Sequence, residues 1–324
     1  MALFLAMLAG CQKSPLPGGG AVAAQKITVA YTLQPQSTLL HVAMVKGYFS
    51  GHGLDVRPLI FGYGKQALQS VVDRQADFAT AAETPIMFSI LNGSGIFVVA
   101  NIEASSLNNG IVGRRDAGIA DARDLKGKRI AYTPGTTSDF FLDSMLTANG
   151  LSRAQISPVA LKPEQMQDAL LANKLDAVST WNYPLTQIKR RLGEAGTVLF
   201  DKHIYTETFN IASSRSFVGK NPGAVEKFLA ALIEAERFVA QHPGEAQDIM
   251  SAAARVDRGL IQDTWSAFNY HVATDRTLLI ALEDETRWAM KNGLTSQLEM
   301  PDYRRYIYHG SLRPIKPEAF GADR

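Results

Sequence analysis

Hydrophobic residues recur along the chain in short runs of two kinds that alternate. Runs of about five residues rich in β-branched and aromatic side chains predict strands, and stretches with apolar residues three or four apart predict helices. In the first part of the chain this pattern predicts strands at residues 26–32, 54–60, 77–81 and 96–102, and helices at 37–48, 65–74 and 85–91. Strands that alternate with helices indicate βαβ units and a mostly parallel sheet.

The same alternation restarts after Gly113. It predicts strands at residues 129–133, 157–161, 176–180 and 197–200, and helices at 139–148, 163–172 and 185–192. The two halves share a local pattern, because an aspartate opens the third strand of each half, at Asp77 and again at Asp176. Helices then predominate, at 222–240, 244–254, 258–270 and 277–292. We therefore expect an α/β fold with two Rossmann-like lobes and extra C-terminal helices that pack on the first lobe.

Composition and charge narrow the functional classes. The chain has 324 residues, of which 46% are hydrophobic, and this is enough material for two domains. The 33 Lys and Arg residues balance 31 Asp and Glu without a long basic run, so nucleic acid is not an expected partner. The sequence has no H-E-x-x-H, C-x-x-C, Walker or G-x-S-x-G motif, and its six histidines have no ligand spacing. We expect no enzymatic activity, no metal and no cofactor.

The one cysteine has an informative position. Residues 2–9 form a short apolar run that leads into Leu8-Ala9-Gly10-Cys11, and this string matches the bacterial lipobox. We expect residues 1–11 to be a lipoprotein signal peptide with Cys11 as the lipidation site; the alternative is a buried structural cysteine after a chance apolar run. Residues 12–25 are rich in Gly and Pro at their start and predict a flexible tether between lipid and globular body. Acyl chains on the mature N-terminus would anchor the protein to a membrane.

The segment at residues 124–150 is the strongest candidate for ligand chemistry. A strand is followed by Pro134-Gly135, then by Thr136, Thr137 and Ser138, then by an amphipathic helix. Hydroxyl residues cap helix N-termini well, and the unpaired N–H groups there attract anions. An ordinary capped helix is the alternative interpretation of this segment alone.

Other polar side chains follow the predicted strands in the same way. Ligands of open α/β sheets bind beyond the carboxyl ends of the strands, and clefts between domains are preferred sites. The candidate ligand-binding residues are Gln34, Gln36, Ser37, Glu83, Thr84, Thr136, Thr137, Ser138, Trp181, Asn182 and Phe209.

Several of these candidates have a structural alternative. Ser37 and Thr84 could act only as N-caps, and Glu83 could serve local capping. A carboxylate at Glu83 would repel a small anion and would better suit an amide, an amine or a pyrimidine ring. Trp181, before an Asn-Tyr-Pro turn, could stack on a ligand or pack under the turn, and its indole N–H needs a partner in either case.

Four phrases carry a family resemblance. They are HVAMVKGYFSGHGLDV at 41–56, DFATAAETP at 77–85, DLKGKRIAYTPGTTS at 124–138 and LDAVSTWNYP at 175–184. The chain resembles the type II periplasmic solute-binding proteins of the nitrate, sulfonate, taurine and thiamine-precursor (NMT1-like) group, over nearly all of residues 26–300.

The resemblance implies two lobes joined by two crossing segments, near residues 107–115 and 205–214, with a solute in the cleft. Lobe I would contain residues 26–112 and 208–324, and lobe II residues 113–207. It also implies an ABC transporter permease as partner. Together with the lipobox, it predicts a location in the periplasm or at the cell surface, lipid-anchored to the membrane, and we expect a monomer. Two alternatives stay open: an enzyme similar to the thiamine-pyrimidine synthases, which share this fold, and a stand-alone sensory receptor. The solute itself is not predicted.

Overall fold

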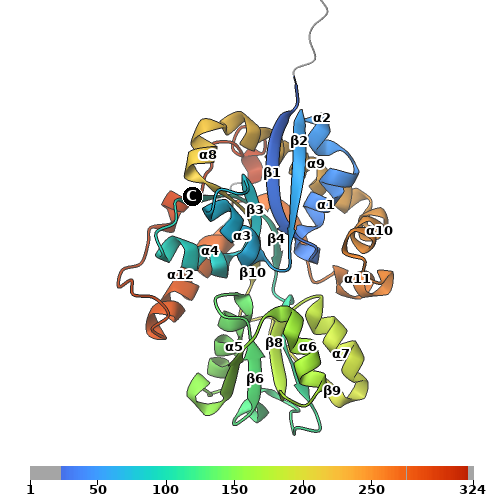
Figure 1. The fold of residues 1–324 in the computed structure, drawn as a ribbon, viewed down its shortest axis with the longest axis vertical. Helices are drawn as coiled ribbons and strands as arrows, with labels where there is room; N and C mark the ends of the chain where they lie inside the picture. The colour runs from blue at the N-terminus through green and yellow to red at the C-terminus, as the bar shows by residue number, and fades with distance from the viewer. Residues whose placement is uncertain (1–22, 275, 320–324) are drawn as a thin grey trace, which may run out of the picture.

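The computed structural model describes residues 23–274 and 276–319. The predicted signal peptide, Cys11 and most of the predicted tether lie outside this range. The described chain is built around two mixed sheets, each at the centre of one lobe (Figure 1). The larger sheet has the strand order β11-β4-β10-β3-β1-β2, and the smaller has the order β7-β6-β8-β5-β9. The predicted α/β fold with two lobes is confirmed.

Lobe I contains the larger sheet and the helices around it. Its strands are β1 (Gln25–Thr32), β2 (Leu54–Phe61), β3 (Phe78–Ala82), β4 (Ile96–Ser105), β10 (Glu207–Ser214) and β11 (Asn269–Ala273). Its helices before the first crossing are η1 (Pro35–Ser37), α1 (Thr38–Val45), α2 (Tyr48–Gly51), α3 (Gly64–Val72) and α4 (Glu83–Leu91). Its later helices are α8 (Arg215–Lys220), α9 (Pro222–Gln241), α10 (Pro243–Ala254), α11 (Arg258–Trp265), α12 (Arg276–Lys291), η5 (Tyr303–Tyr306) and η6 (Pro317–Ala319).

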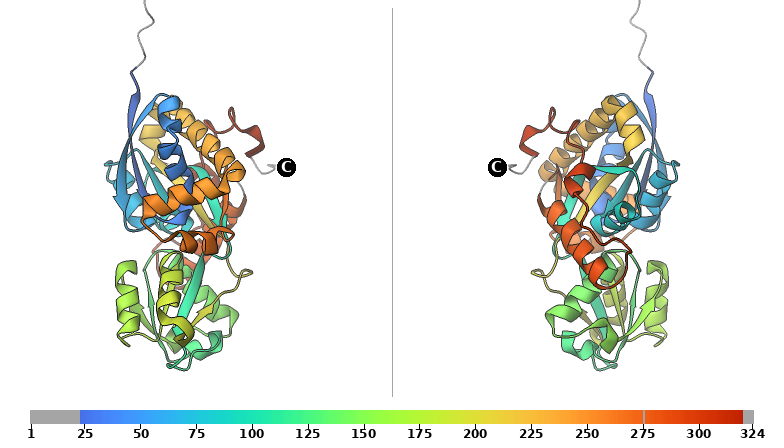
Figure 2. Two further views of the ribbon diagram at one scale, coloured as in Figure 1. Left: turned by 90° about the vertical axis from the view of Figure 1, so that its right-hand side faces the viewer. Right: turned by 90° about the vertical axis from the view of Figure 1, so that its left-hand side faces the viewer.

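Lobe II is formed by the middle of the chain, which is green in Figures 1 and 2. Its strands are β5 (Asn109–Arg114), β6 (Arg129–Tyr132), β7 (Ser157–Ala160), β8 (Ala177–Trp181) and β9 (Gly196–Leu199). Its helices are η2 (Ala122–Leu125), α5 (Thr137–Ala148), η3 (Arg153–Gln155), α6 (Pro163–Leu171), α7 (Pro184–Leu192) and η4 (Gly193–Ala195).

The two lobes repeat one local device. Asp77 Oδ2 accepts a hydrogen bond from the N–H of Thr28 in β1 at 2.7 Å, and Asp176 Oδ2 accepts one from the N–H of Arg129 in β6 at 2.8 Å. The residue three positions before each aspartate has a positive φ, 61° and 60°. Each aspartate therefore ties the start of a strand to its parallel neighbour (β3 to β1, and β8 to β6). This shared geometry explains the Asp pattern seen in the two halves of the sequence.

The crossing segments themselves contain strands. β5 pairs antiparallel with β8 and β9, and β10 pairs antiparallel with β3 and β4. Each sheet is therefore mixed, and the expectation of mostly parallel sheets was wrong because both returning strands are inserted between parallel neighbours. Sheet membership puts the changes of lobe at residues 106–108 and 200–206, slightly before the predicted crossings. Residues 109–112 accordingly belong to the sheet of lobe II.

Two predicted helices differ from the observed ones. The helix expected at residues 37–48 is interrupted at Gly47, whose φ of +72° is left-handed, so that α1 and α2 are separate. The helix expected at 258–270 ends at Trp265, and Asn269–Ala273 forms β11 on the edge of the larger sheet. The apolar residues of this segment fit the spacing of a helix as well as that of a strand, and antiparallel pairing with β4 stabilises the strand.

Helices cover both faces of each sheet, as the side views show (Figure 2). In lobe I, α1 and α9 enclose one core, in which the Phe78 and Phe228 rings stack with centroids 4.2 Å apart. Helices α3, α4 and α12 cover the other face. In lobe II, α5 lies on one face, and Met166 of α6 and Ile188 of α7 are buried on the other. The C-terminal helices pack on lobe I as expected.

Candidate functional site

A narrow recess of about 30 Å³ lies between the lobes. It is formed where strands of both sheets end and the next helices begin, which is the position expected for a ligand in an open α/β sheet. Its lining residues are Thr32, Gln34, Gln36, Tyr63, Gly64, Lys65, Ala82, Pro85, Thr136, Thr137, Trp181, Glu207 and Phe209. The lining thus combines aromatic rings, amides, hydroxyls and one carboxylate.

Six of the predicted binding residues line this recess: Gln34, Gln36, Thr136, Thr137, Trp181 and Phe209. The other five, Ser37, Glu83, Thr84, Ser138 and Asn182, are buried beside it without lining it. All five form hydrogen bonds within the protein. The Ser37 hydroxyl lies 3.3 Å from that of Thr32, Ser138 Oγ accepts from the N–H of Thr133 at 2.9 Å, and Asn182 Oδ1 accepts from Thr186 Oγ1 at 2.6 Å. A binding role for the eleven residues remains a prediction.

The N-terminus of α5 faces the recess through two threonines. Thr136 is the N-cap residue, but its hydroxyl donates to the carbonyl of Thr133 at 2.8 Å and does not cap the helix. Asp139 in the first turn accepts from the N–H of Gly135 at 2.9 Å. Thr137 lies close enough to Glu207 on the other lobe to lower the pKa of that carboxyl. The hydroxyls of Thr136 and Ser138 are therefore committed to protein partners.

Glu207 is the centre of a polar cluster at the start of β10. Its Oε1 accepts from Asn108 Nδ2 at 2.8 Å and from Gln36 Nε2 at 3.4 Å, and its Oε2 accepts from Asn109 Nδ2 at 2.5 Å. Burial raises the pKa of Glu207, while the hydrogen bonds from the three amides and Thr137 act in the opposite direction. The cluster joins β10 and η1 of lobe I to residues 108 and 109, where the chain enters lobe II.

Glu83 belongs to a second, fully buried carboxyl cluster. Its carboxylate accepts from the hydroxyl of Tyr205 and from the N–H of Thr208 at 2.8 Å. Glu285 of α12 accepts from Thr84 and, at 3.4 Å, from Tyr205. Burial raises the pKa of both glutamates well above the ordinary range. The charge of Glu285 raises the pKa of Glu83 further, whereas a hydrogen bond with Glu83 acts to lower the pKa of Glu285. Glu83 holds the second crossing and does not face the recess.

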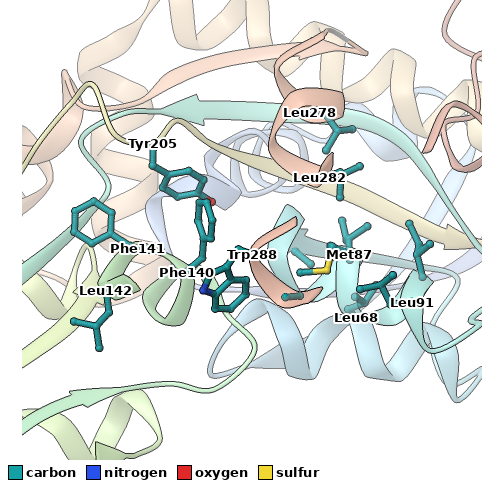
Figure 3. Close-up of a cluster of buried hydrophobic side chains, with 14 of the residues drawn as sticks. Leu68, Met87, Leu91, Phe140, Phe141, Leu142, Tyr205, Leu278, Leu282 and Trp288 are labelled. Carbon is teal, nitrogen blue, oxygen red and sulfur yellow. The ribbon is translucent and has the colours of Figure 1, made fainter. Parts of the chain in front are cut away.

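Aromatic side chains meet where the lobes touch. The ring of Phe140 from α5 lies edge-on to Trp288 of α12, with centroids 5.4 Å apart, and to Tyr205 of the second crossing at 5.1 Å (Figure 3). The Trp288 indole N–H donates to Asp143 Oδ2 at 2.8 Å. These contacts join lobe II to the C-terminal part of lobe I beside the recess.

Two further contacts close the recess from both sides. Lys65 Nζ of α3 donates to the carbonyl of Pro134 at 2.9 Å, and Gln34 Oε1 accepts from the N–H of Tyr183 at 3.2 Å. Lys65 is the only cationic side chain among the described residues that line the recess. Tyr63 and Lys65 were not among the predicted residues. They follow β2, so the rule about carboxyl ends of strands, applied to the Gly62-Tyr63-Gly64 turn, would have found them.

The described residues contain no group of three or more His, Cys, Asp and Glu side chains that could hold a metal ion. Within the same ranges, no helix combines the length and apolarity needed to cross a bilayer.

Residues 34–246 match the model of a protein family described as NMT1/THI5 like. This span includes both crossings and twelve of the thirteen residues that line the recess. The chain belongs to the NMT1/THI5-like family.

Individual relatives of this NMT1/THI5-like chain agree with the fold. A protein of Brucella abortus named as a binding protein is 25% identical over 204 residues. The match covers 62% of this chain and 62% of that relative, so the chain spans less than two thirds of the relative's length. An aliphatic sulfonates-binding protein of Bacillus subtilis is 24% identical over 71% of this chain and 69% of its own. The solved structure of the periplasmic aliphatic sulphonate binding protein of Escherichia coli superposes with a TM-score of 0.75 at 18% identity, over 88% of this chain and 97% of that one.

Proposed function

We propose that the chain is the extracytoplasmic substrate-binding protein of an ABC importer, and that it works as a monomer that captures one small solute between its lobes. Its family membership supports this function, as do relatives named for binding. The observation that carries the proposal is the recess between two sheets, lined from both lobes at the ends of their strands.

Capture would occur by closure of the lobes about the two crossings at residues 106–108 and 200–206. Hinges of this kind absorb backbone rotation in a few residues while each lobe moves as a rigid body. The contacts Lys65–Pro134, Gln34–Tyr183 and Trp288–Asp143 join the lobes only when they are close together. A solute that contacts both walls favours this closed arrangement over an open one.

Location follows from the sequence motif at Cys11. We propose that the protein is lipid-anchored through this cysteine, in the periplasm or at the cell surface, with residues 12–25 as the tether. An anchored receptor stays within reach of its membrane permease, so release of the solute would occur close to the transport channel.

Closure can be tested with two spin labels on the full chain. Cysteines at Gln69 on α3 and Thr147 on α5, both exposed and on different lobes, would be introduced in a Cys11→Ser background. Any small molecule that copurifies would be released by denaturation, identified by mass spectrometry and added back to refolded protein. We expect the label distance to shorten. The absence of a copurifying solute, together with an unchanged distance in the presence of an extract of culture-medium solutes, would contradict the proposal.

A further inference from the structure

The amides around Glu207 have a fixed orientation. A carboxylate can only accept hydrogen bonds, and Glu207 accepts from the amide nitrogens of Gln36, Asn108 and Asn109. Each of these side chains therefore has its carbonyl oxygen directed away from Glu207. With three amide donors, the carboxylate has used most of its capacity of about four lone pairs.

This arrangement leaves acceptors without donors. Gln36 Oε1 and Asn109 Oδ1 are buried and have no hydrogen-bond partner. Gln36 lines the recess. Asn109 lies directly opposite Trp181 in the β5–β8 ladder, so the side chains of Asn109 and Trp181 are on the same face of that sheet. Natural proteins rarely bury an unpaired acceptor, so these two atoms indicate a missing donor.

A third acceptor group lies nearby. Both carboxylate oxygens of Glu103 are buried and without a partner, and Glu103 lies opposite Phe209 in the β4–β10 ladder. Since Phe209 and Glu207 are two residues apart on one strand, Glu103 shares the face that borders the recess. Burial raises the pKa of Glu103 well above its ordinary range, so this carboxyl adds unpaired polar oxygens beside the recess and no fixed negative charge.

The recess also presents donors, but few. Lys65 of lobe I donates to the carbonyl of Pro134 in lobe II, and α5 begins at the recess with Thr136 as its N-cap and Thr137 as its first residue, so N–H groups of the first turn lie there. An acceptor group of a solute would fit there. A solute whose only polar group is an oxyanion would still leave the acceptors at Gln36, Asn109 and Glu103 unpaired.

We propose that the solute carries an N–H-donating group, of the amide, amine or amidine class, on a flat ring. The donors would bond to Gln36 Oε1 and Asn109 Oδ1, and the ring would lie against Trp181 and Phe209, which both line the recess. The inference depends on the proposed function and concerns its selectivity: the site prefers such a group to a sulfonate or nitrate of the same size.

Three probes with one ring and different head groups test this preference. Benzamidine and benzamide donate N–H groups, whereas benzenesulfonate only accepts, and their affinities for the full chain can be measured by calorimetry. We expect benzamidine or benzamide to bind about tenfold or more tightly than benzenesulfonate, because a site built around hydrogen-bond acceptors rejects ligands without donors. Equal or tighter binding of benzenesulfonate, or no binding of any probe, would overturn the inference.

Two variants connect the preference to the residues. Gln36→Met removes one acceptor and should weaken benzamide binding about fivefold or more, and it should weaken benzenesulfonate binding clearly less. Glu207→Gln should reduce the preference itself, because a glutamine cannot accept from all three amides. Gln75→Met, an exposed substitution between α3 and β3, is the control and should change neither affinity. If benzenesulfonate shortens the label distance in the spin-labelled protein, the inferred preference for N–H donors is wrong but the proposed closure of the lobes stands. If the copurified solute does not shorten this distance, the proposed function itself is wrong.

Discussion

The indole N–H of Trp288 donates to Asp143 Oδ2 at 2.8 Å, and this bond joins the last long helix of lobe I to the first long helix of lobe II. Asp143 also accepts from Arg153 Nε at 2.7 Å, so its carboxylate is held in place within lobe II. Because the two partners belong to different lobes, the bond exists only while the cleft is closed and contributes to the free energy of closure.

Trp288→Phe should weaken solute binding. The smaller ring keeps the apolar contact with Phe140 but loses the bond to Asp143, and a hydrogen bond to a charged group contributes about 1.5–3 kcal/mol. We expect about a tenfold loss of affinity, measured by calorimetry with the copurified solute, and an unchanged fold by circular dichroism. Trp265→Phe is the matched control in lobe I, since Trp265 packs on Tyr270 and does not line the recess. Equal effects of the two substitutions would exclude this role.

Trp181→Ala should also reduce affinity, for a different reason. Trp181 ends β8, is only 6% exposed and lines the recess. Loss of a large aromatic contact in a desolvated site costs about 1–3 kcal/mol of binding free energy. Trp181→Phe should restore most of the affinity because a ring remains available for stacking. If Trp181→Ala binds the solute as tightly as the unmodified chain, the ring packs under the turn and does not contact the solute.

The carboxyl pair Glu83–Glu285 should make stability depend on pH. Burial holds the pKa of both groups well above the ordinary range, so the folded chain retains a proton that the unfolded chain loses near pH 4 to 5. In that case the unfolded state binds fewer protons, and the free energy of unfolding falls as pH rises above about 4.5, by up to about 1.4 kcal/mol per pH unit for each retained proton.

Glu285→Gln should flatten this dependence, because an amide cannot ionise and can still accept from Thr84. Denaturant titrations at pH 5 and pH 8 measure the effect. Glu283→Gln, at a partly exposed position on the same helix, serves as control and should keep the original slope. The same fall in stability in both variants would show that another group is responsible.

Cys11→Ser should change location without changing binding. If the lipobox at residues 8–11 is processed, the cysteine is the site of acylation, and its loss leaves the protein without an anchor. Fractionation of cells should then find the variant in the soluble extracytoplasmic fraction, with the affinity for the solute retained. Recovery of the variant in the membrane fraction would show that Cys11 is not the anchor.

Local patterns in the sequence were sufficient for most of the fold. The hydrophobic positions recur every two residues in strands and every three or four in helices, and this difference located most strands and helices. It could do so because the periodicity depends only on residues that are neighbours in the chain. The repeated aspartate predicted two similar lobes, and both aspartates make the same bond to a neighbouring strand. The exceptions were the strands β5, β10 and β11 and the break at Gly47. In these places pairing with a distant strand, or a single left-handed residue, decided the outcome.

The sequence predicted six of the thirteen residues that line the recess. The rule that ligands bind beyond strand ends found Gln34, Gln36 and Trp181, because topology brings such positions to one edge. It could not separate the residues that line the recess from those behind it, such as Glu83, since a strand end has side chains on both faces.

The sequence by itself determined the two α/β lobes and the strand ends that border the recess. The crossings were expected only from the family resemblance, and sheet membership places them slightly earlier in the chain. Only the tertiary structure decided that Glu207 collects the amide donors of residues 36, 108 and 109. These residues are up to 171 positions apart in the chain, and no local pattern relates them. Their mutual orientation arises from the requirement that each buried polar group find a partner, which operates only after the lobes have packed together.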